Sequence, residues 1–355
     1  MKCALIMAGG KGTRFWPVST EEKPKQFLNL LGERTMIQMT IDRLKGYIEL
    51  EKIFICTSQV YIDLIKEQVP EIPERNIIVE PIGMNTAPCV ALSSILINRY
   101  YPNASIFVLP SDHLVSKRDD FINSLEEAYL YLRENNESII TFGINPNRPE
   151  TGYGYIEIDR NDSSRIKRTI KFVEKPNYEK ALEYLVSGNY LWNSGIFAFK
   201  AKYIIELVKK HLPNTYEALK SLEDCEAKDI QKIINANYKN TDSISVDYGI
   251  MERINTIFVI KCDFGWDDVG SWNSLERYAE KDENGNVFIA DGITYNSSNN
   301  IILSRKPIVV NGVKNIIVVE TEEYIMISSK SKEQEIKKAK EELDKLKYME
   351  DKKWE

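Results

Sequence analysis

A glycine-rich segment near the start of the chain has the residue types that bind phosphate. An apolar run over residues 5–8 leads directly into small, polar and basic residues: Gly9, Gly10, Gly12, Thr13 and Arg14. Glycines let backbone N–H groups approach phosphate oxygens without a Cβ in the way. Lys25, within a Pro-Lys-Gln-Phe run, adds a second cation. The segment is therefore a candidate nucleotide phosphate site, although glycines alone also fit a plain turn.

Two better-known phosphate loops do not fit this segment. A Walker loop requires Gly-Lys-Ser/Thr after its four variable residues, whereas Gly12 is followed by Thr-Arg. The dinucleotide fingerprint requires a third glycine at the position of Phe15. The Gly-Gly-x-Gly-x-Arg run, followed at this spacing by Pro-Lys-Gln-Phe, is more specific than the glycines alone.

A second candidate is a carboxylate that follows another strand-like run. Glu80 comes directly after the apolar residues 77–79, and Asn85 and Thr86 then open a helical stretch. A carboxylate can accept hydrogen bonds from both N1–H and the 2-amino group of guanine, a donor pair that uracil and thymine lack. Glu80 is therefore a candidate guanine reader. Asn85 and Thr86 are candidate nucleotide contacts, but a helix N-cap explains either of them equally well.

Acidic residues at two further strand ends are candidate metal ligands. Asp112 follows the apolar residues 106–109, and Asp268 lies in a Gly-Trp-Asp-Asp-Val-Gly-Ser-Trp run. Mg²⁺ prefers one or two carboxylates together with phosphates and water, so this pair suits a metal beside a nucleotide. As alternatives, Asp112 caps a turn and the tryptophan-rich run is an ordinary aromatic turn. His113, one of two histidines, has no nucleophile nearby to activate.

A third group of residues suits a phosphorylated sugar. Gly154 lies between two tyrosines, Glu174 and Lys175 precede a proline, and Asn193 follows a tryptophan. A carboxylate can bind sugar hydroxyls while an ammonium group binds the phosphate. Adjacent residues of a strand face opposite sides, so Glu174 and Lys175 reach one ligand only if the strand ends or bulges there.

The composition excludes several classes of protein. The 355 residues carry 47 basic and 53 acidic side chains, a net charge of −6 that argues against a nucleic-acid-binding surface. The five cysteines are scattered without metal-ligand spacing, which indicates buried apolar residues. No secretory signal or membrane-length apolar run is apparent. We therefore expect a cytoplasmic protein that uses neither nucleic acid nor a membrane.

Strand-like and helical segments alternate over the first two thirds of the chain. Short apolar runs predict strands over residues 2–7, 53–57, 77–79, 106–109 and 139–142. Helical spacing or composition covers residues 36–46, 61–68, 86–100 and 120–133. This alternation predicts an α/β fold with a Rossmann-like mixed, mostly parallel sheet and helices on both faces. Ligands of such sheets bind at the carboxyl ends of the strands, where the candidate residues lie.

The last part of the chain has a different pattern. Very short strand candidates occur at residues 293–295, 301–303, 308–310, 316–319 and 324–327, separated by Asn, Gly and Ser. They fit rungs of a β-solenoid better than further βα units. A charged helix is expected over 332–347. We therefore expect a catalytic domain over residues 1–283 and a smaller domain, with a terminal helix, over 284–355.

Taken together, these segments resemble the sugar-1-phosphate nucleotidyltransferase family, and within it the branch that transfers GMP to mannose 1-phosphate. The match runs in order through seven segments, at residues 9–17, 24–27, 80–88, 110–113, 172–176, 192–195 and 266–272. The resemblance implies a Rossmann-like domain followed by a short left-handed β-helix. It also implies GTP and mannose 1-phosphate as substrates, Mg²⁺ as cofactor and a homodimer.

The resemblance also implies roles for individual residues. Gly9, Gly10, Gly12 and Arg14 would contact the triphosphate, and Lys25 would bridge phosphates. Asp112 and Asp268 would hold Mg²⁺. Mannose 1-phosphate would be held by Glu174, Lys175 and Asn193, with Gly154 beside them. An ionised phosphate oxygen would attack the α-phosphorus of GTP in line, so that no protein nucleophile or general base is required.

Two departures from the family pattern and two alternative functions accompany this hypothesis. Met84 and Thr20 stand where arginine is usual in the family. One alternative is transfer to glucose 1-phosphate from UTP or dTTP, against which Glu80 argues. The other is a regulatory homologue without activity, against which the joint presence of Lys25, Asp112 and Asp268 argues.

Overall fold

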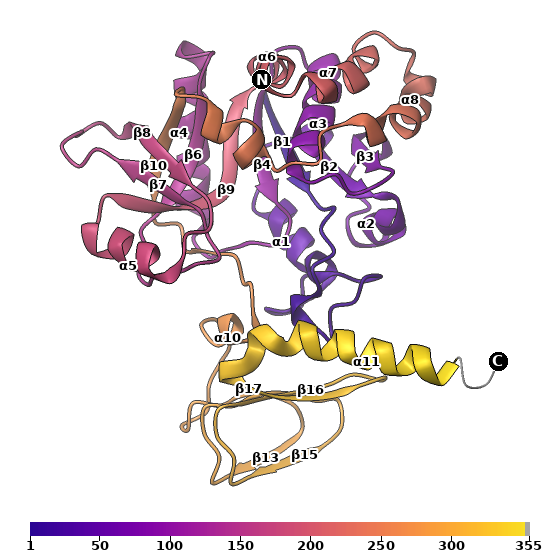
Figure 1. The fold of residues 1–355 in the computed structure, drawn as a ribbon, viewed down its shortest axis with the longest axis vertical. Helices are drawn as coiled ribbons and strands as arrows, with labels where there is room; N and C mark the ends of the chain where they lie inside the picture. Colours follow the sequence, from indigo (N-terminus) through magenta and orange to yellow (C-terminus); the bar gives the residue numbers. More distant parts are fainter. Residues whose placement is uncertain (352–355) are drawn as a thin grey trace. The chain divides into compact units, whose positions relative to one another are not determined.

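The computed structural model describes residues 1–351 (Figure 1). Its contacts divide the chain into two compact units. The first unit comprises Met1–Gly10 and Thr40–Asp267, and the second comprises Lys11–Met39 and the chain from Asp268 onward. The division into domains at residue 283 stays a prediction.

A nine-stranded sheet forms the centre of the first unit, in the order β3-β2-β1-β4-β9-β6-β10-β8-β7. Its strands are β1 Lys2–Met7, β2 Ile53–Ser58, β3 Ile77–Glu80, β4 Ser105–Pro110, β6 Ile139–Ile144, β7 Tyr155–Ile158, β8 Ile166–Val173, β9 Tyr190–Lys200 and β10 Ile257–Cys262. A separate antiparallel pair joins β5 Leu114–Val115 to β11 Trp266–Asp267. All five strands predicted for this part of the chain are present.

The large sheet is mixed, as predicted, but parallel pairing covers less of it than expected. β3, β2, β1 and β4 are parallel to one another, and so are β6 and β10. The long strand β9 runs antiparallel to both of its neighbours, β4 and β6. Strands β7 and β8 also pair in the antiparallel direction. The four parallel strands therefore end at one edge of the sheet, and this edge carries Gly9, Glu80 and Asp112.

Helices cover both faces of this sheet. They are α1 Met36–Asp42, α2 Ile62–Gln68, α3 Thr86–Tyr100, α4 Arg118–Glu134, α5 Tyr178–Ser187, α6 Ala201–His211, α7 Pro213–Leu219, α8 Ile230–Asn237 and α9 Val246–Gly249. The α3 side chains share a buried cluster with Leu5 and Ile257. Tyr131 of α4 packs on Phe258, with ring centroids 5.2 Å apart. Because Ile257 and Phe258 are successive strand residues, these two helices contact opposite faces. Within residues 1–351, no helix has the length and apolar character that crossing a bilayer requires.

Short parallel strands stack in the second unit. Its elements are η1 Thr13–Phe15, η2 Lys25–Phe27, α10 Trp272–Leu275, β12 Val287–Ile289, β13 Gly292–Tyr295, β14 Ile301–Leu303, β15 Ile308–Asn311, β16 Ile316–Glu320, β17 Ile325–Ser329, η10 Lys330–Glu335 and α11 Ile336–Asp351. Strands β12, β14 and β16 pair in parallel, as do β13 and β15. The predicted strands and terminal helix are present, whereas β12 was not predicted. The left-handed sense of the turns stays a prediction.

A ladder of buried asparagines joins successive rungs of this stack. Asn286 and Asn300 are both fully buried. The Asn300 amide nitrogen donates to Asn286 Oδ1 at 3.0 Å and to the Val313 carbonyl at 3.2 Å. Asn300 Oδ1 accepts from the Ile316 backbone N–H at 3.1 Å. The two amides thereby satisfy backbone groups at the turns, where the strand pairing is interrupted.

We expect Asn300→Ala to destabilise the second unit by about 3 kcal/mol, because it leaves several buried polar groups without a partner. Chemical denaturation measures this change in the free energy of unfolding. The matched control is Asn311→Ala, at an exposed position of β15, which should change it by less than about 0.5 kcal/mol. Equal effects of the two substitutions would contradict the ladder.

Candidate active site

Backbone hydrogen bonds continue the sheet beyond the end of β1 and hold the first glycines in place. The Ala8 N–H donates to the Cys56 carbonyl at 2.8 Å, and the Ser111 N–H donates to the Met7 carbonyl at 3.1 Å. Gly10 has open space where a Cβ would lie. The space beside Gly10 is therefore open to a ligand.

Glu80 lies against this glycine segment. A Cβ added to Gly9 would lie 2.9 Å from Glu80 Oε2, so only glycine fits beside the carboxylate. Glu80 is 5% exposed, and the Tyr238 hydroxyl donates a hydrogen bond to its Oε1. Burial raises the pKa of the Glu80 carboxyl to about 7. Burial thus disfavours the ionised form, which donors such as the N1–H edge of guanine would stabilise.

Asn85 and Thr86 have structural roles that sequence analysis left open. Asn85 is the N-cap of α3, with φ of 72°, and its Oδ1 accepts from the Thr86 N–H at 2.8 Å. The Thr86 hydroxyl accepts from the Val246 N–H at 2.9 Å. The cap is thus confirmed for Asn85, and Thr86 holds the segment that leads to Asp247. A nucleotide contact by either residue stays a prediction.

Asp112 and His113 follow β4. Trp266 Nε1 donates to His113 Nδ1 at 3.1 Å, and the two rings pack edge to face. Asp112 Oδ1 lies 3.8 Å from His113 Nε2, and the Asp112 side chain is 33% exposed. His113 therefore packs against β11, whereas Asp112 keeps an accessible carboxylate. In the β5–β11 pair, Asp267 is aligned with Leu114.

Three of the four predicted sugar-phosphate residues meet where β7 begins and β8 ends, beside the first half of β9. The Asn193 N–H donates to the Gly154 carbonyl at 2.8 Å. A Cβ on Gly154 would lie 2.5 Å from Glu174 Oε2 and 3.3 Å from the Asn193 Cβ. Any larger residue at position 154 would therefore displace the carboxylate. The sequence prediction that these residues lie together is consistent with this geometry, and their binding role stays a prediction.

Lys175 joins this group because the strand ends before it. β8 stops at Val173, and Lys175 takes a φ of 45°, unusual for a residue other than glycine. Its ammonium group lies 3.0 Å from Glu174 Oε1 and is largely exposed. Adjacent residues within a strand would point to opposite faces. Because β8 ends before Glu174, the side chains of Glu174 and Lys175 can lie on the same side and form this ion pair.

Asp247 completes the group, and sequence analysis missed it. The Asn193 amide nitrogen donates to Asp247 Oδ1 at 3.2 Å. Burial, and then the nearby Glu174 carboxylate, raise the pKa of Asp247 to about 6. The residue lies in a Ser-Val-Asp-Tyr-Gly run that matched no motif we weighed. The short polar segment before Asp247, which contacts the start of α3 in the structure, is the feature that would have indicated this residue.

In the second unit, the cations of the glycine segment surround Asp268. The buried Lys25 ammonium donates a hydrogen bond to the Asp268 backbone carbonyl. Arg14 lies 3.8 Å from the Asp268 carboxylate, and its side chain is 69% exposed. Gly12, with φ of 38°, lies directly against the backbone of Lys25, because a Cβ at Gly12 would lie 2.9 Å from the Lys25 backbone nitrogen. Thr13 begins η1 directly after it.

The tryptophan-rich run is held by its second tryptophan. Trp272 is 1% exposed, packs edge to face on Phe15 and donates from Nε1 to the Trp16 carbonyl at 3.3 Å. The fully buried Val269 has a φ of 45°, which is strained for a β-branched residue. Strain of this kind persists only where the surrounding packing imposes it. This packing fixes the backbone of the run next to Asp268, and the metal-binding role of Asp268 stays a prediction.

The two departures from the family pattern have local explanations. Met84 is a partly buried side chain that packs against the α3 core cluster. The Thr20 hydroxyl accepts from the Lys23 N–H at 3.1 Å and stabilises a turn before Lys25. Both positions support neighbouring structure.

Comparison with known proteins identifies the family. The model of the family described as "Nucleotidyl transferase" matches residues 3–285. The chain belongs to this family. It is 38% identical over 349 residues to a mannose-1-phosphate guanylyltransferase of Klebsiella pneumoniae, covering 96% of this chain and 74% of that protein. The enzyme of that name from Escherichia coli K12 is 36% identical over 350 residues, with coverage of 96% and 73%.

A solved structure supports the same placement. A Thermus thermophilus protein, described as a mannose-1-phosphate geranyltransferase, has a TM-score of 0.83 and 30% identity. The match covers 97% of this chain and 99% of that one. The resemblance inferred from the seven sequence segments is therefore confirmed at the level of the family and of its mannose-1-phosphate branch.

The raised pKa of Glu80 predicts a pH-dependent stability. Its carboxyl shifts from 4.5 to about 7 in the folded protein, so the folded state holds this proton longer than the unfolded state does. The associated stability is complete below about pH 4.5 and is lost as the pH rises through 7. Relative to wild type, Glu80→Gln should therefore gain on the order of 3 kcal/mol between pH 4.5 and pH 8.

Thermal unfolding of both proteins across this range measures the effect. The matched control is Glu67→Gln on α2, whose side chain is exposed; its difference from wild type should stay constant. A constant difference for Glu80→Gln as well would contradict the burial argument.

Proposed function

We propose that this chain transfers GMP from GTP to α-D-mannose 1-phosphate and releases GDP-mannose and pyrophosphate. The observation that carries the proposal is the identity of 38% over 96% of the chain to mannose-1-phosphate guanylyltransferases. The group formed by Gly154, Glu174 and Asn193 supports it, because it combines acceptors and a donor suited to sugar hydroxyls. Asp247 adds a further carboxyl to the same group.

The nucleotide is assigned to the glycine segment and to Glu80. The phosphate-binding residues of the proposal are Gly9, Gly10, Gly12, Thr13, Arg14 and Lys25, with Asn85 and Thr86 as further nucleotide contacts. Glu80 reads guanine through the two donors of its N1 edge. Tyr238 and the Cys56 thiol take two of the roughly four acceptor positions of the carboxylate, so capacity remains for the base.

Enzymes of this family generally use a divalent metal ion, and we infer that the ion here is Mg²⁺. The chemistry of the residues fits, because Asp112 in the first unit and Asp268 in the second each offer hard carboxylate oxygens on side chains that are 33% and 21% exposed; their joint role is taken from the family resemblance. These two residues would hold the ion. When bound, Mg²⁺ supplies positive charge that neutralises the phosphates of the nucleotide.

The reaction is an in-line displacement at the α-phosphorus. A phosphate oxygen of mannose 1-phosphate forms the new P–O bond, and the bond to the bridging oxygen of pyrophosphate breaks. The attacking oxygen is already ionised, so no general base is needed. Lys25 and Arg14 stabilise the charge that grows on the departing side. Lys175 holds the incoming phosphate, while Glu174 and Asn193 orient the sugar, which lowers the entropic barrier.

We also expect a homodimer and left-handed turns in the β-solenoid, both on the basis of the family resemblance. Light scattering of the purified protein tests the first expectation. A monomer mass at working concentration would contradict it.

One assay tests the proposed activity directly. Purified protein and Mg²⁺ are incubated with each of GTP, ATP, UTP and dTTP against mannose 1-phosphate and glucose 1-phosphate, and pyrophosphate release is measured. We expect the highest rate with GTP and mannose 1-phosphate. A highest rate with UTP or dTTP and glucose 1-phosphate would overturn the proposal in favour of another nucleotidyltransferase.

Lys25→Ala and Asp268→Asn should each lower kcat about 100- to 1,000-fold, because each removes charge used most strongly in the transition state. Steady-state pyrophosphate release measures the change, and circular dichroism confirms folding. The matched control is Lys23→Ala, an exposed lysine two residues before Lys25, which should keep the wild-type rate. A well-folded Asp268→Asn variant with wild-type turnover would defeat the metal assignment.

Glu80→Gln should relax the preference for guanine. The amide keeps the shape of the side chain but loses one acceptor and the charge, so the ratio of kcat/KM for GTP over UTP should fall about tenfold. The panel assay gives this ratio for both proteins. An unchanged ratio would remove Glu80 from base recognition.

A further inference from the structure

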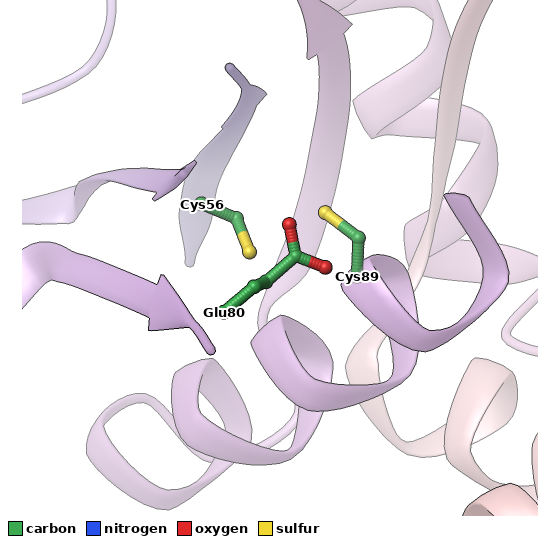
Figure 2. A group of neighbouring side chains, drawn as sticks. All are labelled: Cys56, Glu80 and Cys89. Atoms are coloured by element: carbon green, nitrogen blue, oxygen red, sulfur yellow. The ribbon is translucent and has the colours of Figure 1, made fainter. Parts of the chain in front are cut away.

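Two thiols flank the Glu80 carboxylate in the interior of the first unit. Cys56 comes from β2, Glu80 ends β3, and Cys89 lies in the first turn of α3. One ligand atom from each residue lies within 4.8 Å of the others, and Figure 2 shows the sulfur atoms on either side of the carboxylate. Among the residues that the structure describes, this is the one such group of metal-ligating side chains. The transfer reaction makes no use of a thiol.

The group is buried and places two thiols, a carboxylate and a hydroxyl close together. Cys56, Glu80 and Cys89 are 0%, 5% and 5% exposed. The Ser93 hydroxyl, one helical turn beyond Cys89, is fully buried. It lies within interaction distance of both sulfur atoms, so a polar oxygen is available beside the two thiols and the carboxylate.

We propose that Cys56, Cys89 and Glu80 form a binding site for a thiophilic divalent cation of the Zn²⁺ type. Two thiolates and a carboxylate are ordinary zinc ligands, whereas Mg²⁺ avoids sulfur. Tetrahedral zinc requires ligand atoms about 3.5 Å apart, so small side-chain adjustments complete the site. A neutral oxygen, from Ser93 or from water, takes the fourth position. Binding displaces the two thiol protons to solvent.

The site is distinct from the magnesium site in both residues and chemistry. Asp112 and Asp268 offer only oxygen, and neither belongs to the thiol group. Glu80 is the shared residue between the thiol group and the nucleotide site. A cation that holds its carboxylate withdraws it from guanine, so zinc should raise the KM for GTP. This consequence rests on the proposed function, whereas the binding of the cation does not.

Cobalt titration tests the site. Reduced, chelator-treated protein is titrated with Co²⁺ in excess Mg²⁺, which occupies oxygen-only sites, and the thiolate-to-cobalt charge-transfer absorption in the near ultraviolet is recorded. We expect one equivalent to bind with this absorption in wild type and in Cys262→Ala, the matched control at another buried cysteine. Cys56→Ala and Cys89→Ala should lose the absorption.

Glu80→Gln tests the site even if the cysteine variants fail to fold, because it keeps both thiols and the shape of the third ligand. Its absorption should persist while its cobalt affinity falls at least about tenfold. An absorption that is absent from wild type, or that survives in the Cys56/Cys89 double variant, overturns the proposal. The proposal is also overturned if the metal-free protein binds no cobalt because Cys56 and Cys89 form a disulfide with each other.

Activity measured in Mg²⁺ alone separates this proposal from the proposed function. Cys56→Ala should keep the wild-type rate of GMP transfer, and added Zn²⁺ should raise the KM for GTP in wild type but not in this variant. An inactive wild-type protein that still shows the cobalt absorption would defeat the transferase proposal and leave the cation site standing. Equal zinc inhibition of both proteins would defeat the link to Glu80.

Discussion

Parallel pairing around β1 is the constraint on which the chemistry of the first unit depends. β1 pairs in register with β2 and β4 along its length, and backbone bonds from Ala8 and Ser111 continue this pairing past the strand ends. Three different strands therefore deliver their next residues to a single edge. Gly9, Glu80 and Asp112 reach that edge because parallel strands end together, and the backbone bonds leave little freedom in where they lie.

Several carboxylates lie close together in a site proposed to bind phosphorylated substrates, although phosphates are also negatively charged. The positions of the neighbouring side chains separate the acidic groups from the lysine. Glu174 and Asp247 are close enough that one raises the pKa of the other, while Lys175 pairs with Glu174 from an exposed position. The carboxyls therefore suit hydroxyl groups, and the lysine remains accessible to a phosphate. Backbone strain at Lys175 and Val269 occurs in two of the candidate segments, where packing holds side chains in orientations that relaxed strands would not provide.

Several residues serve the fold and the candidate site at once. Asn85 caps α3, and Thr86, the first residue of that helix, binds the backbone that carries Asp247. Trp272 fills the core of the second unit and thereby holds the run that contains Asp268. The structural explanation that the sequence left open at these positions is thus supported, and it does not conflict with the proposed binding roles. Burial of Glu80 under Tyr238 follows the same pattern.

Local patterns in the chain are enough to predict the order of elements, the mixed α/β sheet and the strand ends where polar residues gather. An apolar run, a glycine or a proline specifies each of these features within a few neighbouring residues. Tertiary packing instead determines the antiparallel direction of β9. It also determines which residues that are distant in the chain contact one another. Tyr238 lies 158 residues from Glu80, and Asp247 lies 54 residues from Asn193. Such contacts leave no periodic or spacing signal in a single sequence, because the packing of separate elements brings the partners together.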